Sequence, residues 1–360
     1  MHDAPCVVCI PAKDEAAHLP STLAALHEAF SRLPGRRGEL VIALDGDRDG
    51  SRSLIEAAAR RFPVGIRIID VPPHAEPHAG RVRRAAMEAG ARAFPLDEVI
   101  LFTTDADTRV HPDWLVKTRR HMQTVDFVCG DIWRDDADGR VVRAPHEHHY
   151  HALHRLRRRI DPIAHDDPDP HPQGFGASLA LRRDTYISVG GCPNIPNNED
   201  VDMVRAARAR GFRVRQPRDV SVLTSSRRDG RATGGLAEAL GREDEDAARG
   251  KPILIVDPRR YVAFFRHSAE LRRAFATNDA DTVETLSRRL QLDPLTVEEA
   301  WNTARSADAF VTQVLPEPNF AADMTLDRAD ALLRAAEAAF DAASLSPAAN
   351  GVSPTLVGAV

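Results

Sequence analysis

Long apolar runs are missing from this sequence of 360 residues. No stretch reaches the ~18 consecutive apolar residues that a membrane-spanning helix requires. No basic leader followed by a long apolar segment precedes the first apolar run, so we expect no signal peptide. The net charge of −5 argues against a protein that wraps nucleic acid. These features predict a soluble, cytoplasmic protein with an ordinary globular core.

Cysteine is scarce, with four in the whole chain. Cys6 and Cys9 form a CxxC pattern, for which a redox pair or a zinc site is one interpretation. No second CxxC completes a zinc site. Side chains three apart on a strand point to opposite faces, so the apolar stretch "CVVCI" favours buried structural thiols.

Two phosphate-binding motifs are also missing. The sequence contains neither GxxxxGK[ST] nor a GxGxxG after the first predicted strand. The phosphates of a bound nucleotide would therefore need a metal ion, and Mg²⁺ prefers carboxylate oxygens together with substrate phosphates.

Strand and helix patterns alternate through the first half of the chain. Apolar runs typical of buried strands occupy residues 6–11, 39–45, 65–71 and 98–105. Helical spacing of apolar residues separates them, at 15–33, 51–62 and 81–94. This alternation predicts an α/β fold with a mostly parallel sheet and helices on both faces.

The pattern changes after a further strand expected at 126–133. Residues 134–173 are rich in His, Asp and Pro and lack a clear period, so we expect a long irregular loop region over 134–175, and loops of this length are usually functional or mobile. Helical patterns dominate from about residue 255. We expect a catalytic domain over 1–250, a helical extension over 251–340 that serves packing or dimerisation, and a flexible tail over 341–360.

Acidic or mixed-charge turns follow three of the predicted parallel strands, at residues 11–15, 45–47 and 105–107. Ligands of open α/β sheets bind outside the carboxyl ends of the strands, so these turns should converge on one edge. Solvated turns would explain each one singly. Two aspartates one residue apart, in "LFTTDADT", instead suit a bound divalent cation.

Six segments, in this order and spacing, resemble the family 2 glycosyltransferases of the GT-A fold. They are "VVCIPAKDEAAHLPSTLAAL", "LVIALDGDRDGS", "GRVRRAAMEAG", "VILFTTDADT", "GFGASLALRRDTYISVGG" and "NNEDVDMVRAARARGFRV", and they cover about residues 5–225. The resemblance implies a GT-A-type α/β fold and a metal-dependent, inverting transfer of a sugar. The donor would be a nucleotide-diphosphate sugar, with a UDP-sugar favoured, the acceptor a hydroxyl group, and the cofactor Mg²⁺ or Mn²⁺.

The resemblance also implies roles for particular residues in donor binding. The "IPAKDE" turn and Asp45 would hold the nucleobase, although Leu44 stands where the family often has another acid. Asp107 would bind the metal between the two phosphates, and Asp105 would contact the ribose or the sugar. The residues given a donor-binding role are Pro11, Ala12, Lys13, Glu15, Asp45, Arg81, Asp105 and Arg228. The neighbours of Arg81, namely Arg83 and Arg84, and those of Arg228, namely Arg227 and Arg231, are alternatives for diphosphate contacts.

Glu199 and Asp200 would form the "ED" motif, with Asp200 as the general base. Inverting transfer needs one carboxylate that removes the acceptor proton, while the leaving diphosphate needs the metal as a Lewis acid. Acids in the first turn of a helix also complement the helix dipole, which is the plain structural alternative.

Other interpretations stay open. The histidines of "HEHHYHALH" (146–154) suit a zinc or copper site or a solvated loop, and "RLRRR" (155–159) suits an anionic ligand or a polar helix face. A sugar-nucleotide nucleotidyltransferase and a non-catalytic sugar-nucleotide-binding protein are the rival functions. We expect residues 134–175 to shape the pocket of a small or soluble acceptor, and we expect no nucleic-acid partner, with a homodimer as one option.

Overall fold

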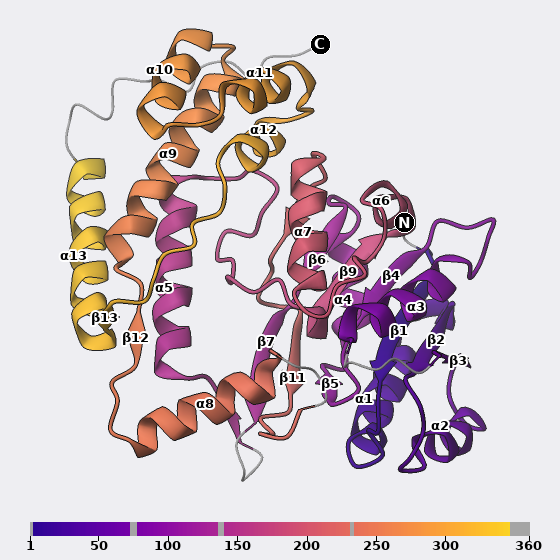
Figure 1. Cartoon of the computed structure of the whole chain (residues 1–360). Helices are drawn as coiled ribbons and strands as arrows, with labels where there is room; N and C mark the ends of the chain where they lie inside the picture. The colour runs from indigo at the N-terminus through magenta and orange to yellow at the C-terminus, as the bar shows by residue number, and fades with distance from the viewer. Residues whose placement is uncertain (1–2, 73–77, 136–139, 231–233, 346–360) are drawn as a thin grey trace.

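The computed structural model describes residues 3–72, 78–135, 140–230 and 234–345. Its described residues form a seven-stranded sheet in the order β10-β6-β9-β4-β1-β2-β3 (Figure 1). Its strands are β1 (Cys6–Ala12), β2 (Gly38–Leu44), β3 (Gly65–Asp70), β4 (Ile100–Thr103), β6 (Phe127–Cys129), β9 (Leu179–Arg182) and β10 (Val214–Arg215). β1 pairs in parallel with β2 and β4, and β2 with β3, whereas β9 runs antiparallel to β4 and β6. The predicted mostly parallel α/β sheet is confirmed.

Helices cover both faces of this sheet. Successive residues of β1 point to opposite faces, so they pack with different helices. Cys6, Val8 and Ile10 pack with one helix group, and Val7 and Cys9 pack with the other. The first group is α1 (Leu19–Arg32), α2 (Ser51–Ala59) and α4 (Trp114–His121); the second is α3 (Ala79–Ala91), α6 (Arg183–Ser188) and α7 (Glu199–Ala209). A short turn of 3-10 helix, η1 (Pro34–Arg36), connects α1 to β2.

The predicted separation of the two cysteines holds in the structure. Cys6 and Cys9 are both buried and free, on opposite faces of the sheet. Burial raises the pKa of Cys6 to about 12, so its thiol is poorly suited to redox chemistry near neutral pH.

A second, smaller sheet lies beside the first, in the order β5-β11-β7-β8. Its strands are β5 (Thr108–Val110), β7 (Asp131–Asp135), β8 (Val141–Val142) and β11 (Ser221–Thr224). The single strand expected at 126–133 is therefore two strands, β6 and β7, in different sheets. Gly130 divides them, and a Cβ there would come within 2.1 Å of Ser178 Oγ, so the chain can bend against η2 (Gly176–Ser178) only with glycine.

Residues 145–160, where the sequence suggested a loop, form the long helix α5 (Pro145–Ile160). Its buried face carries three histidines in addition to Leu153 and Leu156. Because histidine counts as polar in a sequence pattern, the apolar spacing that would indicate a helix is interrupted in this segment. Residues 136–139 of the same expected loop lie outside the described part.

Five further described helices and a two-stranded antiparallel sheet follow α8 (Leu236–Ala248). They are α9 (Pro258–Ala276), α10 (Ala280–Leu290), α11 (Pro294–Thr303), α12 (Ala307–Val314) and α13 (Leu326–Leu345), with β12 (Leu254–Ile255) paired to β13 (Met324–Thr325). The expected C-terminal helices are therefore present. α13 continues to Leu345, so the first five residues of the expected tail at 341–360 are helical, and 346–360 lie outside the described residues.

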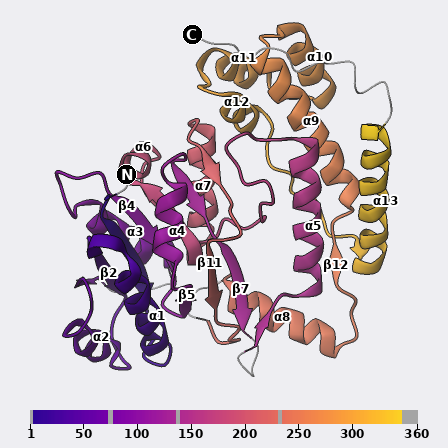
Figure 2. The same cartoon turned by 180° about the vertical axis from the view of Figure 1, so that it is seen from behind.

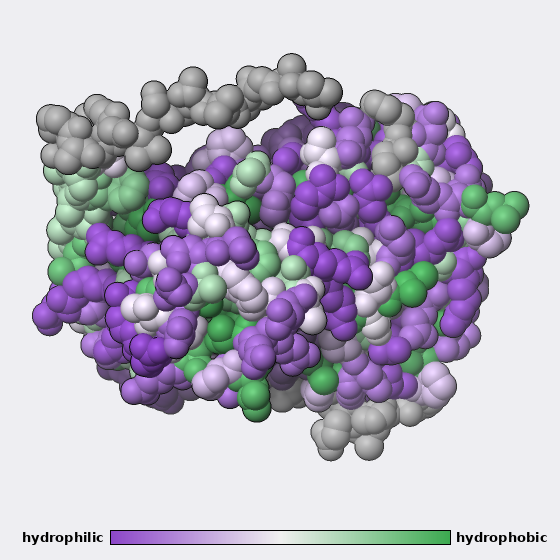
Figure 3. All heavy atoms as spheres, turned by 90° about the horizontal axis from the view of Figure 1, so that it is seen from above, coloured by the Kyte–Doolittle hydropathy of each residue, from purple (hydrophilic) through white to green (hydrophobic). Residues whose placement is uncertain are grey.

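The helical extension packs against α5 rather than forming a separate body (Figures 1 and 2). Leu153 and Leu156 of α5 share one apolar cluster with Phe265 of α9 and Leu333 of α13. α12 packs on α7 at the other end of the extension. Among the described helices, none combines the length and the apolar character that crossing a bilayer would need. The face seen in Figure 3 is mostly hydrophilic, with hydrophobic side chains scattered over it.

The buried histidines around α5 predict an acid-sensitive fold. Burial lowers the pKa of His151 and of His171 to about 3, with Arg143 adding to the effect at both, whereas the unfolded chain has histidine pKa values of ~6.5. The unfolded chain therefore takes up these protons first as the pH falls. Each histidine should remove ~1.4 kcal/mol of unfolding free energy per pH unit between about pH 6 and pH 3.

We expect His151→Gln to flatten the dependence of the urea midpoint on pH between pH 6 and pH 4, because its side chain no longer titrates. The matched control is His27→Gln at an exposed position on α1, which should leave that slope unchanged. Equal slopes for wild type and His151→Gln would show that His151 takes up its proton in the folded state as readily as in the unfolded chain.

Candidate active site

A cavity of about 480 Å³ opens at the carboxyl ends of β1, β2 and β4. This is the edge where the sheet topology places ligands. It brings together nearly all of the residues that the sequence singled out. Those that line it are Pro11, Ala12, Lys13, Glu15, Asp45, Asp105, Asp107, Glu199 and Asp200.

Asp45 lies at one end of the cavity between two cationic side chains. Lys13 Nζ lies 3.0 Å from Asp45 Oδ2, and Arg81 Nη2 lies 3.3 Å from Oδ1. Arg81 also donates to the carbonyl of Pro72 at 2.6 Å. Arg81 therefore reaches the site through Asp45 rather than as a lining residue. Each carboxylate oxygen keeps a further lone pair with which it can accept a hydrogen bond.

Arg83, from the buried side of α3, joins two of the acidic segments. Its Nε donates to Glu199 Oε1 at 2.8 Å and its Nη2 to Asp105 Oδ1 at 2.9 Å. Its Nη1 donates to Thr103 Oγ1 at 2.8 Å and to the carbonyl of Gly176 at 3.2 Å. The two carboxylates hold the pKa of Arg83 above its usual value in spite of burial. A Cβ on Gly176 would come within 2.5 Å of this guanidinium, so the close approach requires glycine.

Asp107 is nearly buried and faces a different arginine. Arg227 Nη2 lies 3.0 Å from Asp107 Oδ2, and the same guanidinium forms a two-pronged pair with Glu15, at 2.7 and 2.5 Å. Burial raises the pKa of Asp107 to about 7; Asp105 adds to this rise and Arg227 opposes it. The aspartate expected to hold a metal thus shares one resident cation with Glu15.

Asp200 is held by backbone amides at the start of α7. Its Oδ2 accepts from Gly176 N at 2.6 Å and its Oδ1 from Val201 N at 2.8 Å. The preceding Glu199 is 3% exposed and committed to Arg83. Of the two acids of the "ED" motif, Asp200 is therefore the one available to a ligand.

Three other arginines that the sequence offered for phosphate contacts are placed differently. Arg228 points away from the cavity lining and pairs with Asp244 at 2.7 Å. Arg84 pairs with Glu88 and donates to the carbonyl of Cys192. Arg231 lies outside the described residues.

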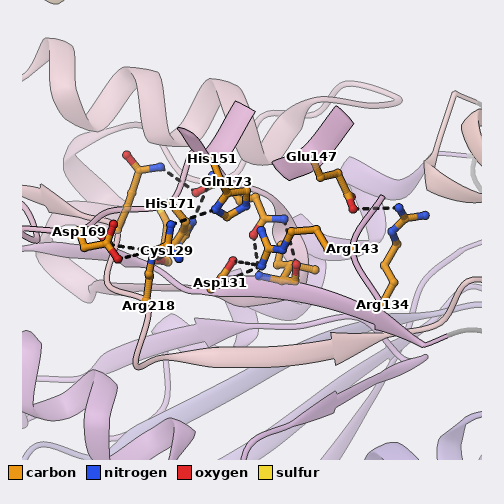
Figure 4. Close-up of polar contacts among 12 residues, drawn as sticks. Cys129, Asp131, Arg134, Arg143, Glu147, His151, Asp169, His171, Gln173 and Arg218 are labelled. Atoms are coloured by element: carbon orange, nitrogen blue, oxygen red, sulfur yellow. Dashed lines mark hydrogen bonds and ion pairs between the residues drawn. The ribbon is translucent and has the colours of Figure 1, made fainter. Parts of the chain in front are cut away.

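The far wall of the cavity comes from segments without any sequence motif. Arg134 of β7 pairs with Glu147 in the first turn of α5 at 3.0 Å (Figure 4). Gln173 exchanges hydrogen bonds with the backbone of Ile132, at 2.6 and 3.0 Å. Phe175 is 51% exposed and also lines the cavity. This wall therefore combines a compensated ion pair, an amide and one exposed aromatic ring.

The histidines of α5 lie behind this wall and have separate partners. His149 pairs with Asp330 of α13 at 2.6 Å, and His146 lies 3.7 Å from Glu243. In the described parts of the chain, no group of three or more His, Cys, Asp or Glu side chains is arranged to hold a metal by itself. Three arginines of the run 155–159 have contacts within the protein: Arg157 with the ring of Phe265, Arg158 with the carbonyl of Asp167, and Arg159 with Asp341.

A metal at this site would have to combine protein carboxylates with groups of a ligand. The described lining carries seven carboxylates, at positions 15, 45, 105, 107, 147, 199 and 200, and four cationic side chains, at 13, 83, 134 and 227. One or two carboxylates completed by phosphates is the usual coordination of Mg²⁺. The donor set around Asp107 fits that pattern.

Comparison with known proteins identifies the family of this chain. The sequence profile described as Glycosyl transferase family 2 matches residues 7–187, which is just over half of the chain. The chain belongs to this family. It is a glycosyltransferase with a GT-A-type fold, a mostly parallel sheet flanked by helices.

Solved structures similar to this glycosyltransferase include two that contain a nucleotide sugar. The mannosyltransferase PcManGT from Pyrobaculum calidifontis, in complex with GDP-Man and Mn²⁺, is 16% identical, with 97% of this chain and 83% of that chain covered and a TM-score of 0.48. S. aureus TarS 1–349, in complex with UDP-GlcNAc, is 13% identical, with 94% and 88% covered and a TM-score of 0.49. No curated protein matches the sequence.

Some residues of this glycosyltransferase site carried no clear signal in the sequence. Arg134, Glu147, Gln173 and Phe175 all fall in the segment expected to be an irregular loop. That segment was expected to shape the acceptor pocket, but its aperiodic pattern marked neither Arg134 nor Gln173. Glu147 lies in the histidine-rich stretch and Phe175 in one of the six resembling segments, and neither was given a role of its own. The side chain of Arg83 could not be told from those of its neighbours on α3 until the packing was known.

Removing the buried guanidinium of Arg83 should strongly destabilise the fold. Arg83→Met leaves Asp105 and Glu199 without their cation, and breaking a buried ion pair in this way costs ~3–5 kcal/mol. The matched control is Arg84→Met, since Arg84 is 37% exposed and surface pairs contribute only ~0–1 kcal/mol. Unfolding free energies from urea titrations should separate the two variants. Similar losses in both would contradict the linking role of Arg83.

Proposed function

We propose that this glycosyltransferase moves a sugar from a nucleotide-diphosphate sugar, with UDP as the favoured nucleotide, to a hydroxyl acceptor, with inversion and with a divalent metal. The observation that carries the proposal is that one cavity contains two separate carboxylates, Asp107 and Asp200. One suits a metal bound to the diphosphate, and the other suits proton removal from the acceptor. These two tasks form the minimal set for inverting transfer.

The charge of the cavity supports a metal-dependent donor site. Seven carboxylates against four cations would repel a diphosphate if nothing else were bound. Asp107 is the residue we propose to hold Mg²⁺ or Mn²⁺, which when bound would act as a Lewis acid and stabilise charge on the leaving diphosphate.

The nucleotide end of the site is proposed to lie at Lys13, Asp45 and Arg81. Asp45 would accept a hydrogen bond from a ring N–H of the base, in addition to its present partners. Lys13 and Arg81 fix the carboxylate from two sides, so its acceptor oxygens are oriented before the donor binds.

Asp200 is proposed as the general base. The amides of Gly176 and Val201 donate to its two oxygens and fix its orientation. The acceptor oxygen would lose its proton to Asp200 while attacking C1 of the sugar from the face opposite the diphosphate. Glu199, bound to Arg83, would position the start of α7 and would not take the proton.

The domain division is proposed on the same basis. Residues 1–250 would form the catalytic domain, with 134–175 shaping the acceptor side and 251–340 forming a helical extension. The contact of α9 and α13 with α5 supports a packing role for the extension.

A thermal-shift panel of UDP-, GDP-, dTDP- and CDP-sugars tests the donor site, with and without Mn²⁺ or Mg²⁺. A donor present at ~100 times its Kd should add ~2.7 kcal/mol of stability. We expect a shift with UDP-sugars that requires the metal. Asp107→Ala should lose both this shift and turnover, while Asp47→Ala, an exposed acid of a neighbouring turn, should keep both. No shift with any donor would favour a non-catalytic protein. Release of pyrophosphate in a separate assay with a nucleoside triphosphate and a sugar 1-phosphate would indicate a nucleotidyltransferase.

Replacing the proposed base should separate donor binding from transfer. We expect Asp200→Asn to lower kcat by ~10²–10⁴-fold, the usual contribution of a positioned base, and to change the donor Kd by less than about twofold. Asp202→Asn is the control, because Asp202 lies on the same helix but pairs with Arg205 at the surface. Robust transfer by Asp200→Asn would show that the proton is removed elsewhere.

A further inference from the structure

Arg227 stands between two carboxylates that come from distant parts of the chain. Its Nη2 lies 2.5 Å from Glu15 Oε1 and 3.0 Å from Asp107 Oδ2, while its Nη1 lies 2.7 Å from Glu15 Oε2. One nitrogen thus touches an oxygen of each acid. The side chains of Arg227, Glu15 and Asp107 are 16%, 6% and 15% exposed, so water contributes little to their compensation.

This contact competes with a metal for the same oxygen. A cation such as Mg²⁺ requires carboxylate oxygens at ~2.0–2.1 Å. A guanidinium that already donates to Asp107 Oδ2 would have to share that oxygen with a second, doubly charged cation. Repulsion between two adjacent cations in a poorly hydrated cavity is strong. Arg227 and a metal on Asp107 therefore compete for the same carboxylate in the present geometry.

Arg227 is also placed to leave Asp107 without leaving the cavity. It follows β11 by three residues and lines the cavity together with Ser225 and the start of α8. Its forked guanidinium suits the oxygens of a phosphate as well as those of a carboxylate. A diphosphate bound near Asp107 would offer such oxygens within the same cavity.

We propose that Arg227 is a resident cation that exchanges partners when the donor complex forms. Without ligand it holds Glu15 and Asp107. When a metal binds Asp107 together with a nucleoside diphosphate, the guanidinium gives up Asp107 and pairs with a diphosphate oxygen. This exchange rests on the proposed donor site. It makes the metal and the nucleotide bind cooperatively, because the metal releases Arg227 from Asp107 and the diphosphate gives Arg227 a new partner.

Metal binding by the full-length protein without donor tests the exchange. Free Mn²⁺ is followed by electron paramagnetic resonance during titration of wild type, Arg227→Lys and Arg227→Met. Lysine keeps the charge but cannot hold both acids with a fork. We expect the Kd for Mn²⁺ to fall by about tenfold in Arg227→Lys, within the usual range of coupling between sites, and further in Arg227→Met.

The control is Arg242→Lys, a 65% exposed residue of α8, which should leave the Mn²⁺ affinity unchanged. With saturating Mn²⁺, calorimetry should show UDP binding several-fold more weakly to Arg227→Lys than to wild type, because a single ammonium replaces the fork. Opposite effects on the two ligands distinguish an exchange from damage to the fold, which would weaken both.

Three results would distinguish a failure of the Arg227 exchange from a failure of the proposed donor site. Equal Mn²⁺ affinity in wild type and Arg227→Lys would overturn the exchange and leave the metal site in place. Mn²⁺ binding to none of the proteins would overturn both, and Arg227 would then be a permanent counter-ion of Asp107. If UDP binds no variant while the Mn²⁺ affinities change as expected, the UDP preference of the proposed donor is wrong and the release of Asp107 by Arg227 stands.

Discussion

The buried guanidinium of Arg83 is the interaction on which the active-site edge depends. It links α3, the end of β4, η2 and the first turn of α7, through Asp105, Thr103, the Gly176 carbonyl and Glu199. These are four separate segments of the sequence. Without a shared cation, the carboxylates of Asp105 and Glu199 would repel one another in a poorly solvated place. One arginine therefore allows the two acidic motifs to lie close together.

The arginines divide the acids of the cavity into two groups. Asp105 and Glu199 both pair with Arg83, and Glu199 is the more deeply buried of the two, at 4% side-chain exposure against 34% for Asp105. Asp200 is held only by backbone amides, and Asp107 by an arginine that is itself partly exposed. The second acid of each motif is thus the one that is not paired with Arg83. This division follows from burial and pairing, which the spacing of the motifs alone does not contain.

The sequence predicted the sheet and the position of the acids because both depend on local patterns. An apolar run followed by an acidic turn marks the carboxyl end of a parallel strand, and parallel strands align those ends. The choice between neighbouring arginines depends on which side of an element faces the core. Arg227 lines the cavity and Arg228 pairs with Asp244 outside it, although both follow the same strand. Helix α5 escaped prediction for a related reason, since neutral, buried histidines replace apolar residues on its inner face.

The helical extension is connected to the cavity wall by its packing on α5. Helices α9 and α13 of the extension pack on the apolar side of α5. The first turn of α5 places Glu147 against Arg134 in the cavity wall. A residue of the extension can therefore alter the acceptor side without lining the cavity, by shifting α5. Donor-side residues, by contrast, are fixed by the ends of central strands and by Arg83. The donor side is consequently the part that family motifs describe, and the acceptor side depends on packing between α5 and helices that lie beyond the family match.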